Sequence, residues 1–254
     1  MHDAQLSCTI GDLVDAMVAP CARRRRATRH ETRKTRKDNR RMKITHLGHA
    51  CLLVETGDTR ILIDPGAFSE GFAELRPVNA VLITHKHFDH FKPAAVSALM
   101  DANPQATLIV ERSTADEVPE SVDTARTQVV STGDKFDVKG VEIMAVGGTH
   151  ASIHPDIDRI PNIGFYFTDS GLLHPGDEFT PPAVDVELLA LPVSGPWQSL
   201  ADAVDYLRAV NPATAFPMHE AVLARPAIYY NYLDSLKPES TKFQVLEPGM
   251  PTEL

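Results

Sequence analysis

Cysteine is scarce in this sequence, which has three among its 254 residues. Cys8, Cys21 and Cys51 are too few and too scattered for a disulfide framework or a thiolate metal site, which favours a reducing compartment, so we expect a cytoplasmic protein. No apolar run reaches the roughly 18 residues that a membrane-spanning helix needs, because Asp, Pro or Gly interrupts the longest ones. The hydrophobic content of 43% still suffices for a core, which excludes a wholly disordered chain, collagen and a coiled coil.

Positive charge is scarce after residue 41. Residues 1–41 hold 11 Lys or Arg and 5 Asp or Glu, a net charge of +6, whereas the rest of the chain holds 14 and 29, a net charge of −15. The basic stretch lacks the apolar periodicity that builds a core. We therefore predict a basic, disordered N-terminal extension at 1–41, with Met42 as an alternative start, and one folded domain at 42–254. The alternative for 1–41 is an arm that binds nucleic acid or another acidic surface.

A secretory signal is not expected at the N-terminus. Such a signal places positive charge before an apolar stretch, whereas here Asp12 and Asp15 interrupt the apolar stretch and the arginines follow it. Export is therefore not predicted.

Strand-like and helix-like segments alternate after Met42. Runs rich in β-branched and apolar residues predict strands at 44–47, 51–55, 60–63, 80–84, 107–110, 127–130, 141–146, 163–167, 187–191, 214–216 and 243–246. Apolar periodicity predicts helices at 94–100, 113–118, 199–210 and 226–236. Strands with interleaved helices indicate a layered α/β architecture with two sheets.

The segment THKHFDH at 84–90 directly follows the most apolar predicted strand. Alternate side chains of an extended segment leave on one side, so His85, His87 and Asp89 can converge while His90 reaches in from another direction. Neutral imidazoles and carboxylates are the ligands of catalytic zinc sites. A solvated polar loop is the alternative, but three adjacent imidazoles repel one another when protonated. The cluster therefore predicts a metal centre.

This motif and two neighbouring segments resemble the metallo-β-lactamase superfamily. The segments are MKITHLGHACLLVE from Met42 to Glu55 and ILIDPG from Ile61 to Gly66. They are similar to the opening of the branch that contains ascorbate-phosphate lactonase and N-acyl phosphatidylethanolamine hydrolase, and the resemblance extends to about Leu236. It implies an α/β fold, a four-layer αββα sandwich of two mixed β-sheets flanked by helices, with the metal site at one sheet edge.

The resemblance also implies a complete ligand set for two metals. The first metal takes the first two histidines of the motif and a histidine at a later strand end, and an aspartate in the segment LLHPGDE bridges the pair. The implied set is His85, His87 and His150 at the first metal, Asp89 and His90 at the second, Asp177 as the bridging carboxylate and His219 as the last ligand.

Several of these assignments have competitors. His154 competes with His150, which we prefer because it follows the predicted strand 141–146 more directly. His174 competes with Asp177, but a histidine in a turn is expected to be exposed. His219 has the alternative of a buried core histidine. Asp169 is expected to be a turn residue between two strands of a hairpin.

Three more residues belong to the predicted pocket. Asp64 is expected to accept a hydrogen bond from a metal-bound imidazole, a role compatible with capping a turn. His49 is a candidate for substrate contact or proton transfer, with a structural role as the alternative. Trp197, the only tryptophan, is expected to line the substrate site or to pack in the interior.

The ligand set predicts a metal-dependent hydrolase that uses a metal-bridging hydroxide as its nucleophile. Asp89 is the expected catalytic residue, because it can orient the hydroxide and receive its proton. Two zinc ions per chain are the expected cofactors, with manganese as the alternative. Iron members of the superfamily generally carry Glu at the position of His87, which argues against oxygen or nitric oxide reduction here.

The expected substrate is a small molecule with a lactone, amide or phosphodiester bond. The charge of −15 outside the extension repels long polyanions and so disfavours RNA or DNA cleavage. A nucleic-acid processing or binding protein anchored by the basic arm is the alternative function. The sequence leaves the oligomeric state open.

Overall fold

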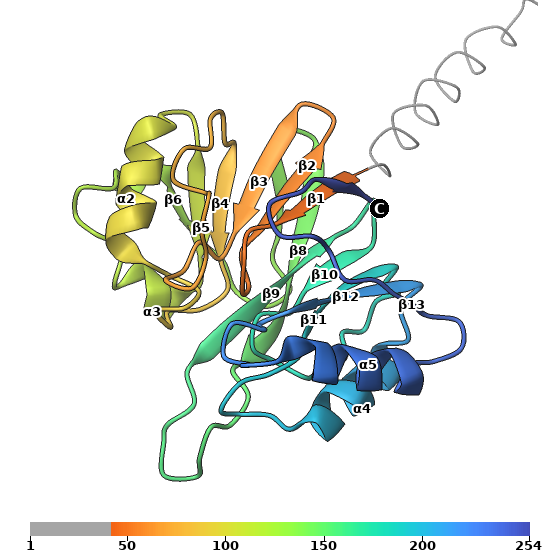
Figure 1. The fold of residues 1–254 in the computed structure, drawn as a ribbon. Helices are drawn as coiled ribbons and strands as arrows, with labels where there is room; N and C mark the ends of the chain where they lie inside the picture. The colour runs from red at the N-terminus through yellow and green to blue at the C-terminus, as the bar shows by residue number, and fades with distance from the viewer. Residues whose placement is uncertain (1–41) are drawn as a thin grey trace, which may run out of the picture. The chain divides into compact units, whose positions relative to one another are not determined.

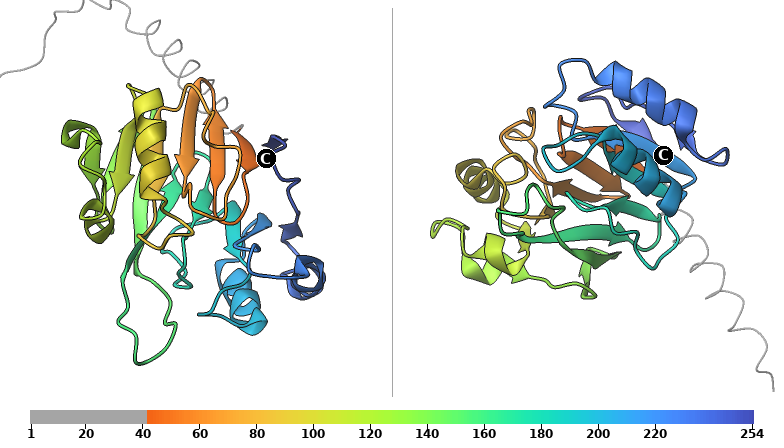
Figure 2. Two further views of the ribbon diagram at one scale, coloured as in Figure 1. Left: turned by 60° about the vertical axis from the view of Figure 1, so that its left-hand side comes forward. Right: turned by 90° about the horizontal axis from the view of Figure 1, so that it is seen from below.

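The computed structural model describes residues 42–254, and the predicted extension at 1–41 lies outside the described residues. Two mixed sheets of seven strands each pack face to face, and helices cover their outer faces (Figure 1, Figure 2). The predicted αββα sandwich is therefore confirmed.

The first sheet has the strand order β14-β1-β2-β3-β4-β5-β6. Its strands are β1 (Met42–His46), β2 (Leu52–Thr56), β3 (Thr59–Ile63), β4 (Ala80–Ile83), β5 (Thr107–Val110), β6 (Thr127–Val129) and β14 (Thr252–Glu253). β1 to β3 pair antiparallel, and β3 to β6 pair parallel. Every residue of β4 is buried, as expected for a central parallel strand that is covered on both faces.

The second sheet has the strand order β13-β12-β11-β10-β9-β8-β7. Its strands are β7 (Lys135–Val138), β8 (Val141–Thr149), β9 (Pro161–Phe167), β10 (Leu172–His174), β11 (Leu188–Pro192), β12 (Thr214–Met218) and β13 (Lys242–Phe243). β7 to β10 pair antiparallel, and β10 to β13 pair parallel.

The helices bury their apolar sides against the two sheets. They are α2 (Pro93–Ala102), α3 (Arg112–Ala115), α4 (Leu200–Val210), α5 (Pro226–Leu236) and the short 3₁₀ helix η1 (Thr124–Arg126). α2 packs on the first sheet through Val96 and Leu99, and α4 packs on the second through Ala203 and Leu207. In residues 42–254, no helix combines the length and the apolar character that crossing a membrane requires.

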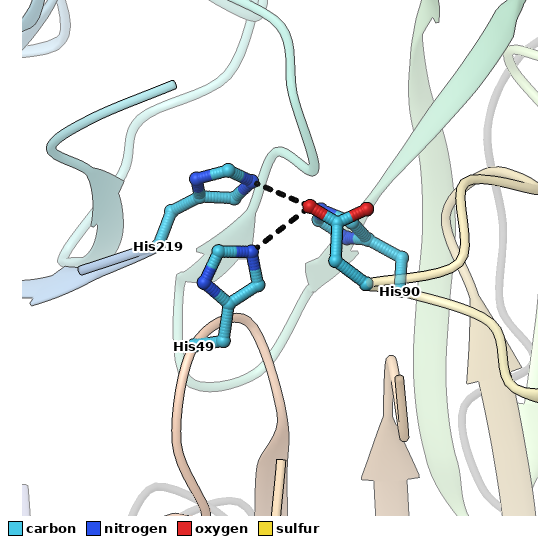
Figure 3. Close-up of side chains that lie close together, drawn as sticks. His49, His90 and His219 are labelled. Atoms are coloured by element: carbon cyan, nitrogen blue, oxygen red, sulfur yellow. Dashed lines mark hydrogen bonds and ion pairs between the residues drawn. The ribbon is translucent and has the colours of Figure 1, made fainter. Parts of the chain in front are cut away.

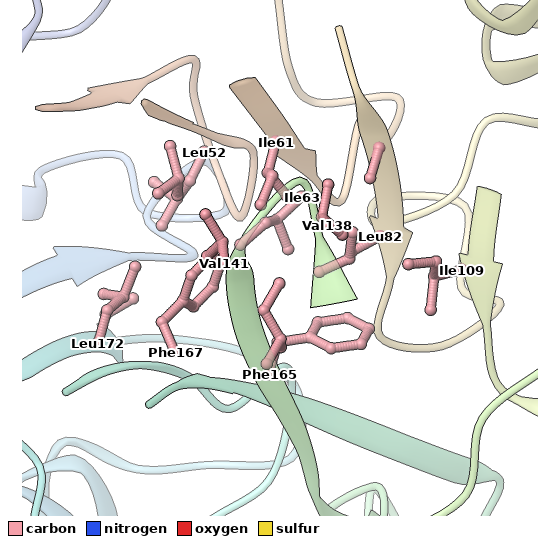
Figure 4. Close-up of a cluster of buried hydrophobic side chains, with 14 of the residues drawn as sticks. Leu52, Ile61, Ile63, Leu82, Ile109, Val138, Val141, Phe165, Phe167 and Leu172 are labelled. Atoms are coloured by element: carbon pink, nitrogen blue, oxygen red, sulfur yellow. The ribbon is translucent and has the colours of Figure 1, made fainter. Parts of the chain in front are cut away.

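The main core lies between the two sheets. Side chains of both inner faces interdigitate there, among them Leu52, Ile61, Ile63, Leu82, Ile109, Val138, Val141, Phe165, Phe167 and Leu172 (Figure 4). Full burial of one such side chain contributes about 1.5 to 3 kcal/mol, so this layer fixes the sheets against each other. Loops at the strand ends are thereby held on a rigid base.

The strand and helix predictions differ from the structure mainly in short elements. The strands β7, β10 and β14 were not predicted from the sequence. The strand predicted at 243–246 corresponds to β13, which is only two residues long. The helix predicted at 113–118 is also shorter, because α3 covers only Arg112–Ala115, after which Asp116 is its C-cap. Strands this short carry too few residues for alternation to be visible in the sequence.

Candidate metal centre

The predicted ligands gather at one end of the sandwich, although they come from distant parts of the chain. The segment 84–90 follows β4 of the first sheet. His150, Asp177 and His219 lie just beyond β8, β10 and β12 of the second sheet, and His49 lies between β1 and β2. Each ligand position is therefore a strand end or a loop next to one, where the side chain is free of the sheet but held by it.

The donors form two groups of four. The first donor group is His85, His87, His150 and Asp177, and the second donor group is His49, Asp89, His90 and His219. Within each group, one ligand atom of every residue lies within 4.8 Å of the others. The structure thus brings together all seven predicted metal ligands, and it adds His49 to them.

Asp177 lies between the two donor groups. Its Oδ2 is 3.8 Å from His85 Nε2 and 3.3 Å from His150 Nε2 in the first group. The same oxygen is 3.2 Å from His219 Nε2, and Oδ1 is 3.2 Å from His90 Nε2 in the second group. One carboxylate therefore reaches both groups, which is the position of a bridging ligand.

Asp89 is the centre of the second donor group. His49 Nε2 and His219 Nε2 approach its Oδ2 to 3.1 and 3.6 Å, and both imidazoles point at this oxygen beside His90 (Figure 3). The side chain of Asp89 is 15% exposed, whereas those of His49 and His219 are buried. Asp89 is thus a carboxylate of the centre that solvent and a small molecule can reach.

The hydrogen bonds of two histidines, His90 and His150, leave their Nε2 atoms without a hydrogen bond and facing the donor groups. His90 Nδ1 donates to Asp64 Oδ2 at 2.7 Å, and His150 Nδ1 donates to the Ala151 carbonyl at 2.6 Å. His85 Nδ1 lies 3.0 Å from the Thr84 hydroxyl, which itself donates to Asp64. The acceptors at His90 Nδ1 and His150 Nδ1 are oxygen atoms, so each Nδ1 carries a proton and Nε2 is the atom that can bind a metal.

Buried polar atoms that make no hydrogen bond show that the residues fit a metal. His90 Nε2, His150 Nε2, His219 Nε2 and Asp177 Oδ1 are buried and make no hydrogen bond. Burial of such atoms costs free energy unless a partner satisfies them. All four point into the donor groups, and nitrogen and oxygen donors of this kind suit zinc. The geometry therefore matches two metal ions.

The charge states of His85 and of both carboxylates suit cations. Burial alone would lower the pKa of His90, but Asp177 and Asp64 outweigh it and raise that pKa well above normal, so His90 must lose a proton to bind a metal. Burial lowers the pKa of His85 far below its usual range, so this imidazole is neutral and able to bind a metal. Burial alone would raise the pKa of Asp177, but the neighbouring His219 and His90 outweigh it and hold that pKa well below normal. For Asp89, burial is likewise outweighed, here by the hydrogen bond from His49, and the pKa falls to about 2. Both carboxylates are ionised at neutral pH.

Asp64 and two glycines shape the centre from outside. Asp64 is completely buried and accepts hydrogen bonds from the Thr84 amide and hydroxyl as well as from His90. A Cβ on Gly66 would lie 1.8 Å from the carbonyl oxygen of Asp89, so only glycine lets the two segments approach this closely. Gly176 has the left-handed φ of 64° in the turn that presents Asp177.

The competing histidines lie elsewhere. The side chain of His154 is 61% exposed, and its Nδ1 accepts a hydrogen bond from the Asp156 amide outside both groups. The expectation that His174 is exposed is wrong, because it is the last residue of β10 and lies completely buried, 2.9 Å from the Ala50 carbonyl. Asp169 lies in the turn between β9 and β10.

Trp197 closes the centre from the side of the second sheet. It is 8% exposed, and its ring centroid lies 5.7 Å from that of His150 and 5.6 Å from that of His219. The same ring packs on Phe179 at 5.1 Å. The single tryptophan therefore contacts one imidazole of each donor group and also packs in the interior.

Two acidic residues next to ligands were not singled out from the sequence. Glu178 follows Asp177 and accepts a hydrogen bond from the Gly148 amide at 2.9 Å. Glu220 follows His219 and accepts one from the His49 amide at 3.1 Å. Their adjacency to ligands is the only signal in the sequence, because the partner amides lie 30 and 171 residues away.

Comparison with known proteins agrees with this geometry. Residues 43–219 match the family model described as a β-lactamase superfamily domain. The chain belongs to the β-lactamase superfamily. This match covers the segments on which the resemblance was predicted and all seven predicted metal ligands, so the predicted superfamily is confirmed.

Relatives within the β-lactamase superfamily align with most of the chain. Protein Rv0786c of Mycobacterium tuberculosis is 43% identical over 211 residues, which cover 81% of this chain and 96% of that protein. A protein of Thermoplasma acidophilum named UPF0173 metal-dependent hydrolase is 26% identical over 222 residues, which cover 81% of this chain and 90% of the relative.

Solved structures of other hydrolases share the fold at low sequence identity. Igni18, a metallo hydrolase of Ignicoccus hospitalis, superposes with a TM-score of 0.68 at 21% identity and covers 84% of this chain and 98% of its own. An isothiocyanate hydrolase from Delia radicum gut bacteria gives a TM-score of 0.61 at 18% identity and covers 83% of this chain and 98% of its own. These likenesses concern the fold alone.

Proposed function

We propose that this metal-dependent hydrolase holds two zinc ions and cleaves a lactone, amide or phosphodiester bond of a small molecule. The observation that carries the proposal is the position of Asp177, whose two oxygens reach ligand atoms of both donor groups. The name metal-dependent hydrolase, which the relative from Thermoplasma acidophilum bears, is in keeping with it.

The residues of the two donor groups and Trp197 have different roles in the proposed hydrolysis. The two donor groups would hold two divalent ions, which would supply hydroxide at neutral pH and polarise the oxygen of the scissile bond. Asp89, ionised and partly exposed, is placed to orient the attacking water and to receive its proton. The contact of His49 with Asp89 Oδ2 fixes the carboxylate while this happens. Trp197 shields the inner side of the centre from water.

Aromatic side chains near Asp89 support an uncharged, partly apolar substrate. Phe68 is 39% exposed and Phe88 63% exposed, and their rings meet edge to face at 5.2 Å. Phe68 also contacts His49 at 5.1 Å. Within residues 42–254, Asp89 and Asp177 form ion pairs with histidines only. No Lys or Arg side chain is therefore paired with these two carboxylates, where it could bind an anionic substrate. Among the three bond types, lactones and amides suit this rim better than phosphodiesters.

Metal analysis and a substrate screen test the proposal together. We expect about two zinc ions per purified chain, and turnover of at least one member of a panel of neutral lactones, amides and phosphodiesters. Asp89→Ala should lower kcat by about 100-fold or more, as expected for loss of a group that accepts the proton. Asp156→Ala is the matched control, because that side chain is 89% exposed outside the centre. A chain without bound metal, or a fully active Asp89→Ala variant, would contradict the proposal.

The nucleic-acid alternative has no observation in its favour within residues 42–254, which carry a net charge of −15. Deleting residues 1–41 separates the two functions. Turnover of the small substrate should be unchanged by the deletion, and salt-sensitive polynucleotide binding that disappears with residues 1–41 would support the alternative. A cytoplasmic location stays a prediction that rests on the few cysteines.

A further inference from the structure

His49 and His219 of the second donor group have an unusual backbone. Their φ angles are 55° and 65°, in the left-handed region that non-glycine residues rarely adopt. Both residues are buried and follow strands of different sheets, His49 after β1 and His219 after β12. Residues in such conformations persist only where their surroundings hold them, and they concentrate at functional sites.

The backbone of His49 is held at both its polar groups. Its carbonyl accepts a hydrogen bond from the His219 amide at 2.9 Å and lies 2.9 Å from His46 Nε2. Its amide donates to Glu220 Oε1 at 3.1 Å. The loop after β1 and the loop after β12 are thus tied together by two hydrogen bonds, and Glu220 supplies one of them.

The side chain of Glu220 is placed to hold the backbone of His49. This side chain is only 18% exposed, and its Oε2 is buried without a hydrogen bond, 3.6 Å from His46 Nε2. Burial of a carboxylate costs free energy unless hydrogen bonds compensate it, and the hydrogen bond from the His49 amide does so here. Glu220 lies in neither donor group, so its action passes through the backbone of His49 and through its neighbour in sequence, His219.

We propose that Glu220 is a positioning residue that holds His49 and His219 against Asp89 and thereby sets the metal affinity of the second donor group. The inference rests on the proposed function, which supplies the metal. Glu178 is the counterpart at the first donor group. It binds the Gly148 amide just before His150, and a Cβ on Gly147 would lie 2.1 Å from Glu178 Oε2.

The test measures the two metal affinities separately in the full chain. Metal-free protein is titrated with zinc against a chromophoric chelator, and the fluorescence of the single tryptophan, Trp197, gives a second signal because its ring contacts both groups. The variants are Glu220→Ala, Glu220→Gln and Glu178→Ala. Glu74→Gln is the surface control, since the side chain of Glu74 is 91% exposed.

Glu220→Ala should weaken zinc binding at the second site by about 10- to 100-fold, the usual effect of removing a partner that orients a ligand, and change the first site by less than about twofold. Glu220→Gln keeps an oxygen that can accept from the His49 amide, so it should recover most of the affinity. Glu178→Ala removes the acceptor of the Gly148 amide and should therefore weaken the first site instead. If Glu220→Ala does not fold, the inference is judged on Glu220→Asp, which keeps the charge, withdraws the oxygen from the His49 amide and should weaken the second site alone.

Three results would overturn the inference. Equal loss at both sites, with a matching drop in the melting temperature of the metal-free protein, would mean that Glu220 supports the fold generally. Unchanged affinities at both sites in Glu220→Ala would mean that it positions nothing. In both cases, a wild type that binds two ions leaves the proposed function intact. A wild type that binds a single ion contradicts the two-metal proposal and removes the second site on which Glu220 would act.

Discussion

The two donor groups differ in how the backbone presents them. None of the four residues of the first donor group has a left-handed backbone, whereas His49 and His219 of the second both do. The first group has a single carboxylate, the buried Asp177, while the second has the partly exposed Asp89. The ligands of the first group thus have ordinary backbone angles, with glycines taking the left-handed positions beside His150 and Asp177, whereas two ligands of the second group take such positions themselves. The second group is also the one with an accessible carboxylate.

Asp177→Ala should have the largest effect, because it removes the carboxylate that both groups share. We expect metal content to fall from about two ions to less than one per chain, with loss of turnover. Metal analysis by mass spectrometry, alongside turnover of the screened substrate, checks this. Retention of two ions would show that the groups bind independently of Asp177.

Metal removal should destabilise the whole sandwich. Each donor group joins residues that follow β4 or β1 of the first sheet to residues that follow strands of the second, so bound ions cross-link the two sheets. A ligand present at about 1000 times its dissociation constant stabilises the folded state by about 4 kcal/mol. Thermal melts with zinc and with excess chelator should therefore differ by several degrees or more. Equal melting temperatures would contradict the cross-link.

Asp64→Ala should have the next-largest effect, and it should lower zinc affinity more at the second donor group than at the first. The substitution leaves the Thr84 amide and His90 Nδ1 without their buried acceptor, which costs about 3 kcal/mol of folding free energy. Because His90 then loses the bond that orients its ring, zinc affinity at the second site should fall by about 10- to 100-fold. Denaturant melts of metal-free protein and zinc titration measure the two effects. An unchanged second site would show that His90 is oriented without Asp64.

Gly66→Ala should disturb the second donor group locally. The new Cβ would lie 1.8 Å from the Asp89 carbonyl oxygen and 2.5 Å from the His90 amide nitrogen, so the segment that carries both ligands must move. A shift of this kind costs about 1 to 3 kcal/mol of stability and should lower turnover. The first-site zinc affinity should change less than the second-site affinity, and the reverse order would contradict the assignment of Asp89 and His90.

Trp197→Phe should have the smallest effect of these substitutions on stability and zinc affinity. The emission of Trp197 in the wild type should respond to both donor groups. Phenylalanine keeps an aromatic ring against His150 and His219, so we expect a change of less than about 1.5 kcal/mol in stability and similar zinc affinities. In the wild type, zinc binding should change the emission of Trp197 in both steps of the titration. A change in only one step would place the tryptophan at one group alone.

The sequence predicted most of the fold and the ligands, for identifiable reasons. The strand β4 is a continuous apolar run, β3 and β5 each end in three consecutive apolar residues, and the motif at 84–90 brings four donors within seven residues. Such signals are local. His150, Asp177 and His219 were located only through the family resemblance, since no spacing rule links residues so far apart.

Other features depend on packing that the sequence does not display. β10 was missed because it is three residues long, and His174 was expected at the surface although it ends that buried strand. Glu220 binds an amide 171 residues away, a contact that only the pairing of the two sheets creates. Long-range contacts of this kind hold the ligands of the second donor group in place. The residues of the first group were therefore easier to predict from the sequence than those of the second.

Anomalous diffraction at the zinc edge, from crystals of the metal-loaded protein, tests the central claim most directly. The account predicts two peaks about 3.5 to 4 Å apart. One peak should lie among His85, His87 and His150 and the other among Asp89, His90 and His219, with the Asp177 carboxylate between them. A single peak, or a pair of peaks that Asp177 does not contact, would contradict it.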